Sequence, residues 1–122
     1  MTRPLLAESA IHPAIRQRIA DHHLPVIQQV QAAMAQHPVV VVGLSGNPYV
    51  GKARKALDLA GVAHEYIEFG SYFSRWRLRN ALKMWTGWPT FPMVFVRGTL
   101  VGGADDLRRL IDSGELDQLR QA

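Results

Sequence analysis

Residues 39–61 read VVVVGLSGNPYVGKARKALDLAG, and this stretch decides the fold. Its opening run, VVVVGL, is apolar and β-branched, which is typical of a strand buried on both faces of its sheet. Asn47 is a favoured N-cap residue and Pro48 suits the first helical position, so a helix is predicted from Pro48 to Ala60. Gly61 is the natural residue to end that helix.

The pattern extends in both directions from this stretch. Apolar residues recur at helical spacing in residues 8–36, and Arg97-Gly98 joins two short apolar runs as a tight hairpin turn would. A helix between two strands implies a right-handed parallel crossover, and the hairpin adds an antiparallel pair. The predicted elements are two helices within 8–36 divided at Pro25, strands at 39–44 and 62–69, helices at 48–60 and 71–85, strands at 93–96 and 99–101, and a helix from Asp105 or Asp106 through Ile111 that ends at Gly114.

Composition indicates one ordinary globular domain. The chain has 122 residues, of which 48% are hydrophobic and 20% are charged. No apolar run approaches the roughly 20 residues that a membrane span needs, and the first residues lack the apolar core of a signal peptide. We therefore expect no membrane association and a cytoplasmic location.

The chain contains no cysteine. Disulfides, iron–sulfur ligation by the protein's own thiolates and a cysteine nucleophile are excluded. The five histidines show no metal-ligand spacing, so no metal site is predicted and no cofactor is required.

Positive charge is concentrated in the middle of the chain. The net charge is +4, and no acidic residue occurs between Phe69 and Ala104. A solvated helix face explains most such charges, but an anionic partner for this segment is also compatible with them. The basic residues there are Arg75, Arg77, Arg79, Lys83 and Arg97.

Residues 46–53 come close to the phosphate-loop pattern G-x-x-x-x-G-K-[ST] and lie between a predicted strand and a predicted helix. Ala53 occupies the Ser/Thr position and has no hydroxyl for Mg²⁺. No later strand ends in a convincing metal-binding aspartate, so a nucleotide-binding interpretation is disfavoured.

The same residues resemble the active-site helix of glutaredoxins, which begins Cys-Pro-Tyr-Cys and continues into a basic turn. Asn47 occupies the first cysteine position and Val50 the second. Further along, WPTFP (residues 88–92) is similar to the family's Thr-x-Pro loop. VGGADDL (residues 101–107) is similar to its Gly-Gly-Cys-Asp-Asp-Leu segment. The stretch RNALKMWTGWPTFP and the extra N-terminal helix resemble the monothiol branch.

The resemblance covers roughly residues 26–117. It implies an α/β thioredoxin-like fold, with a central mixed four-stranded sheet flanked by helices and with extra N-terminal helices. We divide the chain into an N-terminal helical extension (1–36) and a glutaredoxin-like domain (37–122).

Thiol–disulfide exchange needs a thiolate as nucleophile or leaving group. In this family the helix N-terminus stabilises that thiolate, but Asn47 can be neither nucleophile nor leaving group. Val50 cannot resolve a mixed disulfide, and Ala104 replaces a third family cysteine. Glutaredoxin activity is therefore expected to be absent, and the chain is not expected to be an enzyme.

The resemblance also implies a glutathione-binding groove around Asn47. The residue before a cis-proline, here Phe91 before Pro92, pairs with the ligand backbone. The helix start after Gly-Gly receives the γ-glutamyl carboxylate, and basic side chains meet the glycyl carboxylate. Leu44 replaces a lysine of the dithiol branch, so one anion contact is lost. The implied glutathione-binding residues are Tyr49 at the rim, Arg79, Lys83, Phe91, Pro92, Gly103, Ala104, Asp105 and Asp106.

Three hypotheses follow. The first is a redox-inactive glutaredoxin-like protein that binds glutathione or a peptide without catalysis. The second is a protein-interaction module of the same fold with an unknown protein partner and no small ligand. The third, which ranks last because no nucleic-acid motif supports it, is polyanion binding through residues 75–83 with Tyr72, Phe73 and Trp76 nearby.

Overall fold

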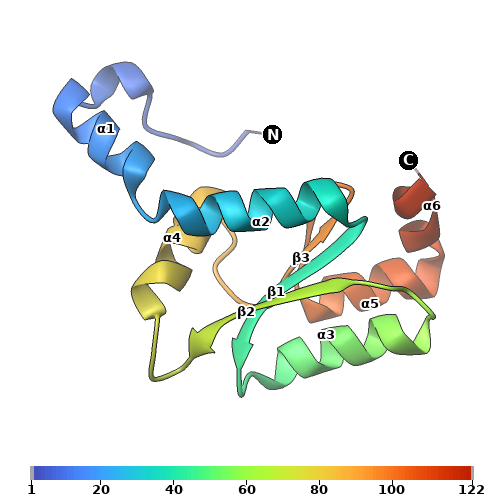
Figure 1. The fold of residues 1–122 in the computed structure, drawn as a ribbon. Helices are drawn as coiled ribbons and strands as arrows, with labels where there is room; N and C mark the ends of the chain where they lie inside the picture. Colours follow the sequence, from blue (N-terminus) through green and yellow to red (C-terminus); the bar gives the residue numbers. More distant parts are fainter. Residues whose placement is uncertain (1, 122) are drawn as a thin grey trace.

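The computed structural model describes residues 2–121 and contains one four-stranded mixed sheet with helices on both faces. Its elements in chain order are a 3₁₀ turn (Glu8–Ala10), α1 (Pro13–Asp21), α2 (Leu24–Gln36), β1 (Val39–Ser45), α3 (Pro48–Leu59), β2 (Glu65–Ser71), α4 (Trp76–Thr86), β3 (Met93–Val96), β4 (Thr99–Gly102), α5 (Ala104–Ser113) and α6 (Glu115–Gln121) (Figure 1).

The strand order in the sheet is β2-β1-β3-β4. The pair β1 and β2 is parallel, as the crossover through α3 requires, and the other two pairs are antiparallel. Arg97 and Gly98 at the hairpin turn both have positive φ (50° and 77°), which matches a two-residue turn between β3 and β4. The thioredoxin-like architecture expected from the sequence is confirmed.

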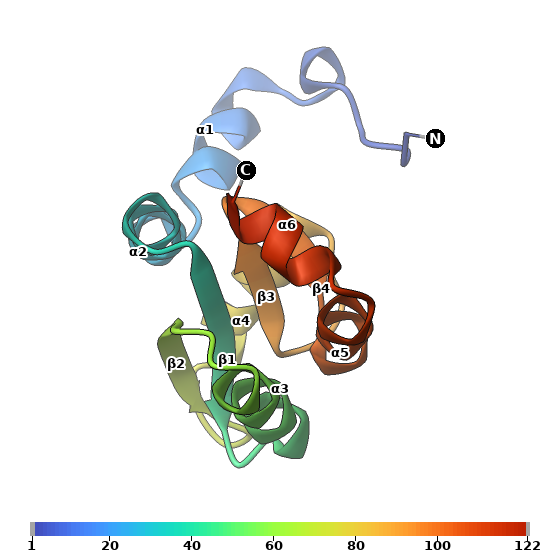
Figure 2. The ribbon, with the colours of Figure 1, turned by 90° about the vertical axis from the view of Figure 1, so that its right-hand side faces the viewer.

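β1 runs through the middle of the molecule, and its side chains alternate between two hydrophobic clusters. Val40, Val42 and Leu44 face α2 and α4, whereas Val39 and Val41 face α3 and α5. Figure 2 shows the strands between α2 on one side and α3 and α5 on the other. The predicted burial of this strand on both faces is therefore confirmed.

Two element boundaries differ from the sequence prediction. β2 begins at Glu65, because the N–H of Val62 donates to the Leu57 carbonyl (2.9 Å) and so belongs to the end of α3. α4 begins at Trp76 rather than at residue 71, because Ser71 and Ser74 form a hydrogen-bonded turn and Arg75 has a φ of 58°.

The C-terminal helix α6 was not predicted from the sequence. Gly114 ends α5 with a φ of 82°, as expected, but the Ser113 hydroxyl then accepts from the N–H of Glu115 and a second helix begins. Leu116 fixes α6 in place, because its side chain is buried in the cluster between the sheet and α5.

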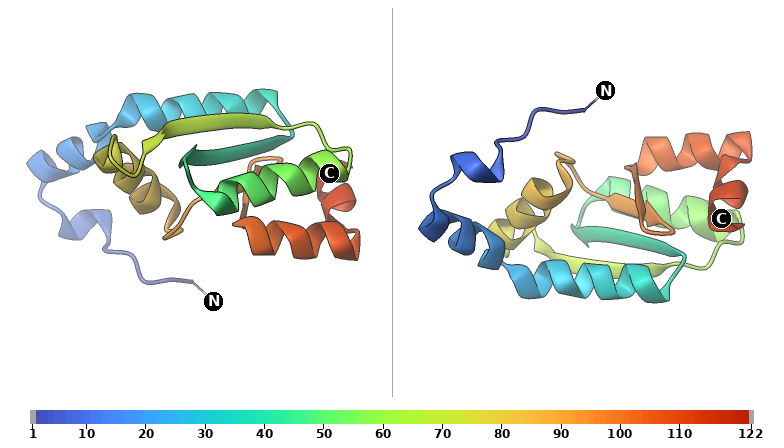
Figure 3. Two further views of the ribbon diagram at one scale, coloured as in Figure 1. Left: turned by 90° about the horizontal axis from the view of Figure 1, so that it is seen from below. Right: turned by 90° about the horizontal axis from the view of Figure 1, so that it is seen from above.

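The N-terminal helices behave differently from each other. α2 packs on β1 and buries Val30 completely, whereas α1 buries none of its residues. α1 lies beyond one end of α2 (Figure 3). The chain changes direction at His22 and His23 rather than at Pro25, because Pro25 is accommodated in the first turn of α2.

Gly43 in β1 allows α3 to pack closely on the sheet. A Cβ added there would lie 2.7 Å from Val50 Cγ2. We predict that Gly43→Ala lowers the free energy of unfolding by about 1–3 kcal/mol through overpacking. Val50→Ala in the same chain should recover part of this loss, as measured by urea unfolding.

Gly51→Ala is the matched control, because a Cβ at Gly51 meets nothing within 4 Å. In the first turns of α3 it should be neutral or stabilise the protein by up to about 1 kcal/mol. Equal unfolding free energies for Gly43→Ala and Gly51→Ala would contradict the packing argument.

Candidate functional site

Asn47 lies in the connection from β1 to α3 and caps that helix. Its Oδ1 accepts from the backbone N–H of Tyr49 (2.8 Å) and of Val50 (3.2 Å). Two of the N–H groups that a helix N-terminus leaves without intrahelical acceptors are thereby satisfied. The side-chain Nδ2 of Asn47 remains as a donor at the mouth of the site.

Val50 and Tyr49 follow Asn47 and point in different directions. Val50 is 4% exposed and packs against Gly43, so the position of the second family cysteine has become part of the core. Tyr49 is 51% exposed, and Lys52 Nζ lies 5.0 Å from its ring centroid. The Tyr49 side chain is therefore available to solvent at the start of α3.

Tyr66 lies beside the same packing contact, within 3.2 Å of the Cβ position at Gly43. Burial, followed by the hydrogen bond to Glu68 and its charge, raises the pKa of Tyr66 to about 12. The phenol is therefore neutral at pH 7 and offers no nucleophile to replace the lost thiol.

Phe91 and Pro92 lie at the same end of the sheet as Asn47. Their peptide bond is cis, in agreement with the expectation from the resemblance. Met93 pairs with Val42 near the end of β1, so the preceding residues lie beside the connection that leads to Asn47. Phe91 as a whole is only 8% exposed, and its side chain belongs to the cluster that faces α2 and α4.

Gly103 connects β4 to α5 and lies against the loop that carries Pro92. A Cβ added to Gly103 would lie 3.5 Å from the Pro92 carbonyl oxygen and 3.9 Å from Trp88 Nε1. The Gly103 N–H donates to Asp106 Oδ2 (3.0 Å), and Arg109 Nη1 lies 3.1 Å from Asp106 Oδ1. The Asp106 carboxylate is thus already engaged within the protein.

The backbone N–H groups of Ala104, Asp105 and Asp106 precede the first intrahelical bond of α5, which runs from the Leu107 N–H to the Gly103 carbonyl (3.0 Å). Such a helix start favours an anion because of its dipole and its available donors. The resemblance implies that these amides receive a carboxylate. In the structure they follow Gly103, which lies beside the loop that carries Pro92.

Trp88 is a site residue that the sequence did not single out. Its indole Nε1 is buried and has no hydrogen-bond partner among residues 2–121, although buried indole N–H groups usually have one. It lies beside Gly103, at the junction of the proline loop and α5. The signal for it was its place next to Pro89 in the WPTFP motif.

The sequence predicted that Arg79 and Lys83 lie together on an open helix face. The structure differs from that prediction. Lys83 is partly buried, with its Nζ 5.8 Å from the Phe91 ring centroid. Arg79 is only 7% exposed, and its Nη1 donates to the carbonyls of Phe69 (2.9 Å) and Ser74 (2.6 Å). Arg79 therefore closes the turn between β2 and α4, and Lys83 is the one of these two cations that is not bound to backbone carbonyls.

The residues that the structure describes form neither a metal-binding cluster nor a helix that could cross a membrane. Within residues 2–121, no three His, Asp or Glu side chains come together closely enough to hold a metal ion. None of the helices described there has the length and apolarity to cross a membrane.

Comparison with known proteins identifies the family. Residues 39–101 match the family model described as Glutaredoxin. A "Glutaredoxin-like protein" of Dictyostelium discoideum is 47% identical over 98 residues, which are 80% of this chain and 80% of that protein. The chain belongs to the glutaredoxin family.

Monothiol glutaredoxins are among the relatives. Monothiol glutaredoxin-S17 of Arabidopsis thaliana is 37% identical over 84 residues, which are 66% of this chain but only 17% of that longer protein. Oxidised glutaredoxin 2 of Chlamydomonas reinhardtii is 29% identical with a TM-score of 0.69, over 81% of this chain and 94% of that one. A buckwheat glutaredoxin–glutathione complex is 25% identical with a TM-score of 0.71, over 83% and 92%.

This glutaredoxin-family chain therefore brings together the segments that resemble the family motifs and contains no cysteine. The cis-proline loop, the Gly-Gly turn and the start of α5 come together, whereas Asn47, Val50 and Ala104 fill the three cysteine positions. Among the residues expected at the site, Arg79 differs from its predicted outward placement, because its guanidinium is bound to backbone carbonyls.

We predict that Arg79→Ala lowers the free energy of unfolding by about 2–4 kcal/mol, because two charge-assisted hydrogen bonds to backbone carbonyls are lost. Lys83→Ala, four residues along the same helix, should change it by less than about 0.5 kcal/mol. Urea unfolding followed by tryptophan fluorescence measures both. If the two variants were equally stable, the guanidinium would not be what holds the turn.

Proposed function

We propose that this protein is redox-inactive and binds glutathione or a related peptide without catalysis. The binding groove in this proposal lies between Asn47, the Phe91-Pro92 loop and residues 103–106. Its part in cell redox homeostasis is recognition of the ligand rather than reduction of it.

One observation carries the proposal: the buried, unpaired indole N–H of Trp88 beside Gly103 and the Pro92 carbonyl oxygen. A buried donor without an acceptor is costly, and a bound ligand is one of the explanations for such a group. The start of α5 provides further donors on the other side of Gly103. Together they suit the γ-glutamyl carboxylate of glutathione.

The remaining groups of glutathione also have candidate partners. The backbone of Phe91 precedes the paired part of β3, so it is available to pair with the peptide backbone of the ligand. Lys83 above the Phe91 ring is placed for the glycyl carboxylate. Asn47 Nδ2 can donate to the ligand sulfur, and Tyr49 forms the exposed rim.

Catalysis is excluded from the proposal on chemical grounds. A disulfide is exchanged only when a thiolate attacks it, and no residue of this chain has a thiol. The similarity to a buckwheat glutaredoxin whose solved structure is a glutathione complex supports the choice of ligand.

The direct test is a titration of ¹⁵N-labelled protein with reduced glutathione, followed by NMR. We expect saturable shifts of the Trp88 indole N–H and of the amides of Ala104, Asp105 and Asp106. Cysteinylglycine is the matched control ligand, because it lacks the γ-glutamyl carboxylate and should leave these signals unchanged. A titration that does not saturate up to roughly 10 mM glutathione would reject the proposal. Such a result means a binding free energy weaker than about −3 kcal/mol.

A gain-of-function variant tests the same groove. Asn47→Cys places a thiol at the start of α3, where the dipole lowers its pKa. The thiolate should attack oxidised glutathione, release one reduced glutathione and keep the other as a mixed disulfide. The control is His12→Cys, since His12 caps α1 but lies at no groove.

We expect Asn47→Cys to form the mixed disulfide about tenfold faster than His12→Cys. This ratio corresponds to an activation free energy that is lower by about 1.4 kcal/mol. Lys83→Ala should remove most of this advantage, and neutral 2-hydroxyethyl disulfide should show none. Equal rates for both cysteine variants, measured by mass spectrometry, would mean that the groove no longer recognises glutathione.

A further inference from the structure

Four large apolar side chains lie exposed on the turn before α4 and along that helix. The exposed fractions are 60% for Tyr72, 98% for Phe73, 55% for Trp76 and 65% for Met84. We call these four residues the aromatic face. Single exposed apolar residues are ordinary, but several on one turn and one helix mark an interaction surface.

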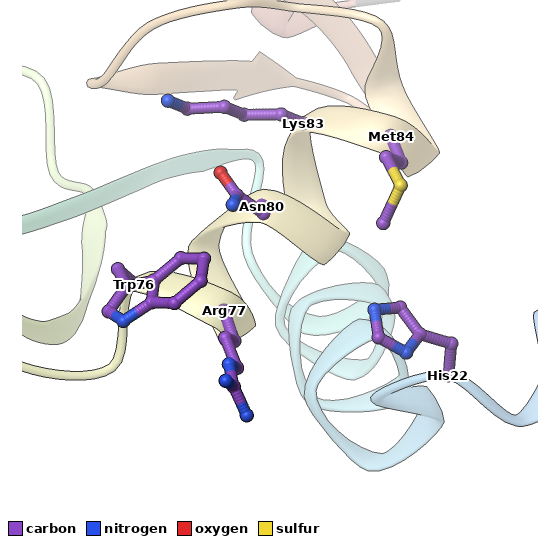
Figure 4. A pocket seen from close by; sticks show the side chains of 6 residues that line it. All are labelled: His22, Trp76, Arg77, Asn80, Lys83 and Met84. Carbon is purple, nitrogen blue, oxygen red and sulfur yellow. The ribbon is translucent and has the colours of Figure 1, made fainter.

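A groove of about 360 Å³ adjoins the aromatic face. Trp76, Asn80 and Met84 follow one another along α4 at spacings of four residues, and His22 approaches from the junction of α1 and α2. Figure 4 shows His22 projecting toward Met84. The volume lies within the range of pockets that accept small ligands or single large side chains. The lining residues are His22, Trp76, Arg77, Asn80, Lys83 and Met84.

The turn that carries Tyr72 and Phe73 is held by hydrogen bonds. The Ser74 hydroxyl accepts from the N–H of Ser71 (3.0 Å), and the Ser71 hydroxyl accepts from the N–H of Phe73 (3.2 Å). Arg79 donates to the Ser74 carbonyl from within the core. Tyr72 and Phe73 are therefore carried by a turn whose backbone is held by hydrogen bonds, and a pre-organised backbone loses less conformational entropy on binding.

The charges around the groove are positive. Arg77 and Lys83 line it, and no acidic residue lines it. Arg75 lies at the start of α4, and Arg77 lies 5.1 Å from the Trp76 ring centroid. Asp21, next to His22 in the chain, holds the side-chain amide of Gln17 with both carboxylate oxygens. Charge complementarity therefore selects an acidic partner.

We propose that the aromatic face and its groove dock an acidic, amphipathic segment of a partner protein. A large apolar side chain of that segment enters between Trp76, Met84 and His22. Its flanking carboxylates pair with Arg75 and Arg77. Tryptophan and arginine are the residue types that most often dominate binding energy at such surfaces.

Two other occupants fit less well. The α1 helix of a second copy has exposed Ile15 and Ile19 among Arg16 and Arg18, so it would bring positive charge to a positive surface. A nucleic acid would contact the arginines, but a groove walled by Trp76 and Met84 takes an apolar side chain better than a phosphate.

The test is selection from a random library of displayed peptides of about 12 residues, about three helical turns if helical, on the immobilised protein. We expect the enriched peptides to carry several Asp or Glu residues around a large apolar residue. Fluorescence anisotropy then measures each peptide against Met84→Glu and against Leu59→Glu. Leu59 is the matched control because it is 80% exposed on α3, so the same charge is introduced away from the groove.

Met84→Glu should weaken binding by about tenfold or more, as loss of a central contact does, and Leu59→Glu should leave it unchanged. Replacing the Asp and Glu residues of a selected peptide by Asn and Gln should also weaken binding. The proposal is overturned if enriched peptides lack acidic residues, if nothing is enriched, or if both variants bind alike.

Two competition experiments distinguish peptide binding at this surface from the binding of other ligands. Lys83 lines the groove and is also the proposed partner of the glycyl carboxylate, whereas the proposed carboxylate partners of the peptide are Arg75 and Arg77. We therefore expect that reduced glutathione does not displace a selected peptide and that Met84→Glu responds to glutathione as the unmodified protein does. Oligo(dT) should not compete for the groove. If oligo(dT) bound saturably with a steep salt dependence and Met84→Glu abolished that binding, the occupant would be a nucleic acid and the peptide assignment would be wrong.

Discussion

The burial of β1 between two layers of helices is the constraint on which the rest of the structure depends. Its side chains alternate between two hydrophobic clusters, and those of Val39 to Val42 have no exposed surface. Complete burial of one such side chain stabilises the fold by about 1.5–3 kcal/mol. A one-residue shift of this strand would exchange the two faces, so the register with β2 and β3 is firmly set.

That register also assembles the site. β1 ends beside the start of β3, which places the connection carrying Asn47 next to the Phe91-Pro92 loop. The chain returns through the β3–β4 hairpin to Gly103, which contacts the same loop. The connection that carries Asn47, the Phe91-Pro92 loop and Gly103 are therefore brought together by how the sheet is built. This arrangement forms although Asn47, Val50 and Ala104 occupy the three family cysteine positions.

Asn47 shows why the fold tolerates the loss of the thiol. A helix start needs an acceptor for its first N–H groups, and the Asn47 side-chain oxygen supplies one as a cap. Val50 fills its position with apolar volume against Gly43. Stability and redox chemistry are thus separable at this site. The proposed glutathione site needs no nucleophile, and the proposed docking surface at the aromatic face is likewise independent of sulfur.

Local signals in the sequence determined much of this protein. The β-branched run at 39–44, the Asn-Pro start of α3 and the Arg-Gly turn each act on neighbouring residues, so they were readable in order along the chain. The absence of cysteine, and with it the lack of any thiol chemistry, is also fixed by the sequence alone.

The tertiary structure decided what the side chains meet. Helical spacing placed Arg79 beside Lys83, but only packing directs its guanidinium to the carbonyls of Phe69 and Ser74. The buried indole N–H of Trp88 also depends on residues far away in the sequence. Periodicity tells which residues share a face, whereas hydrogen-bond partners and burial depend on what folds against that face.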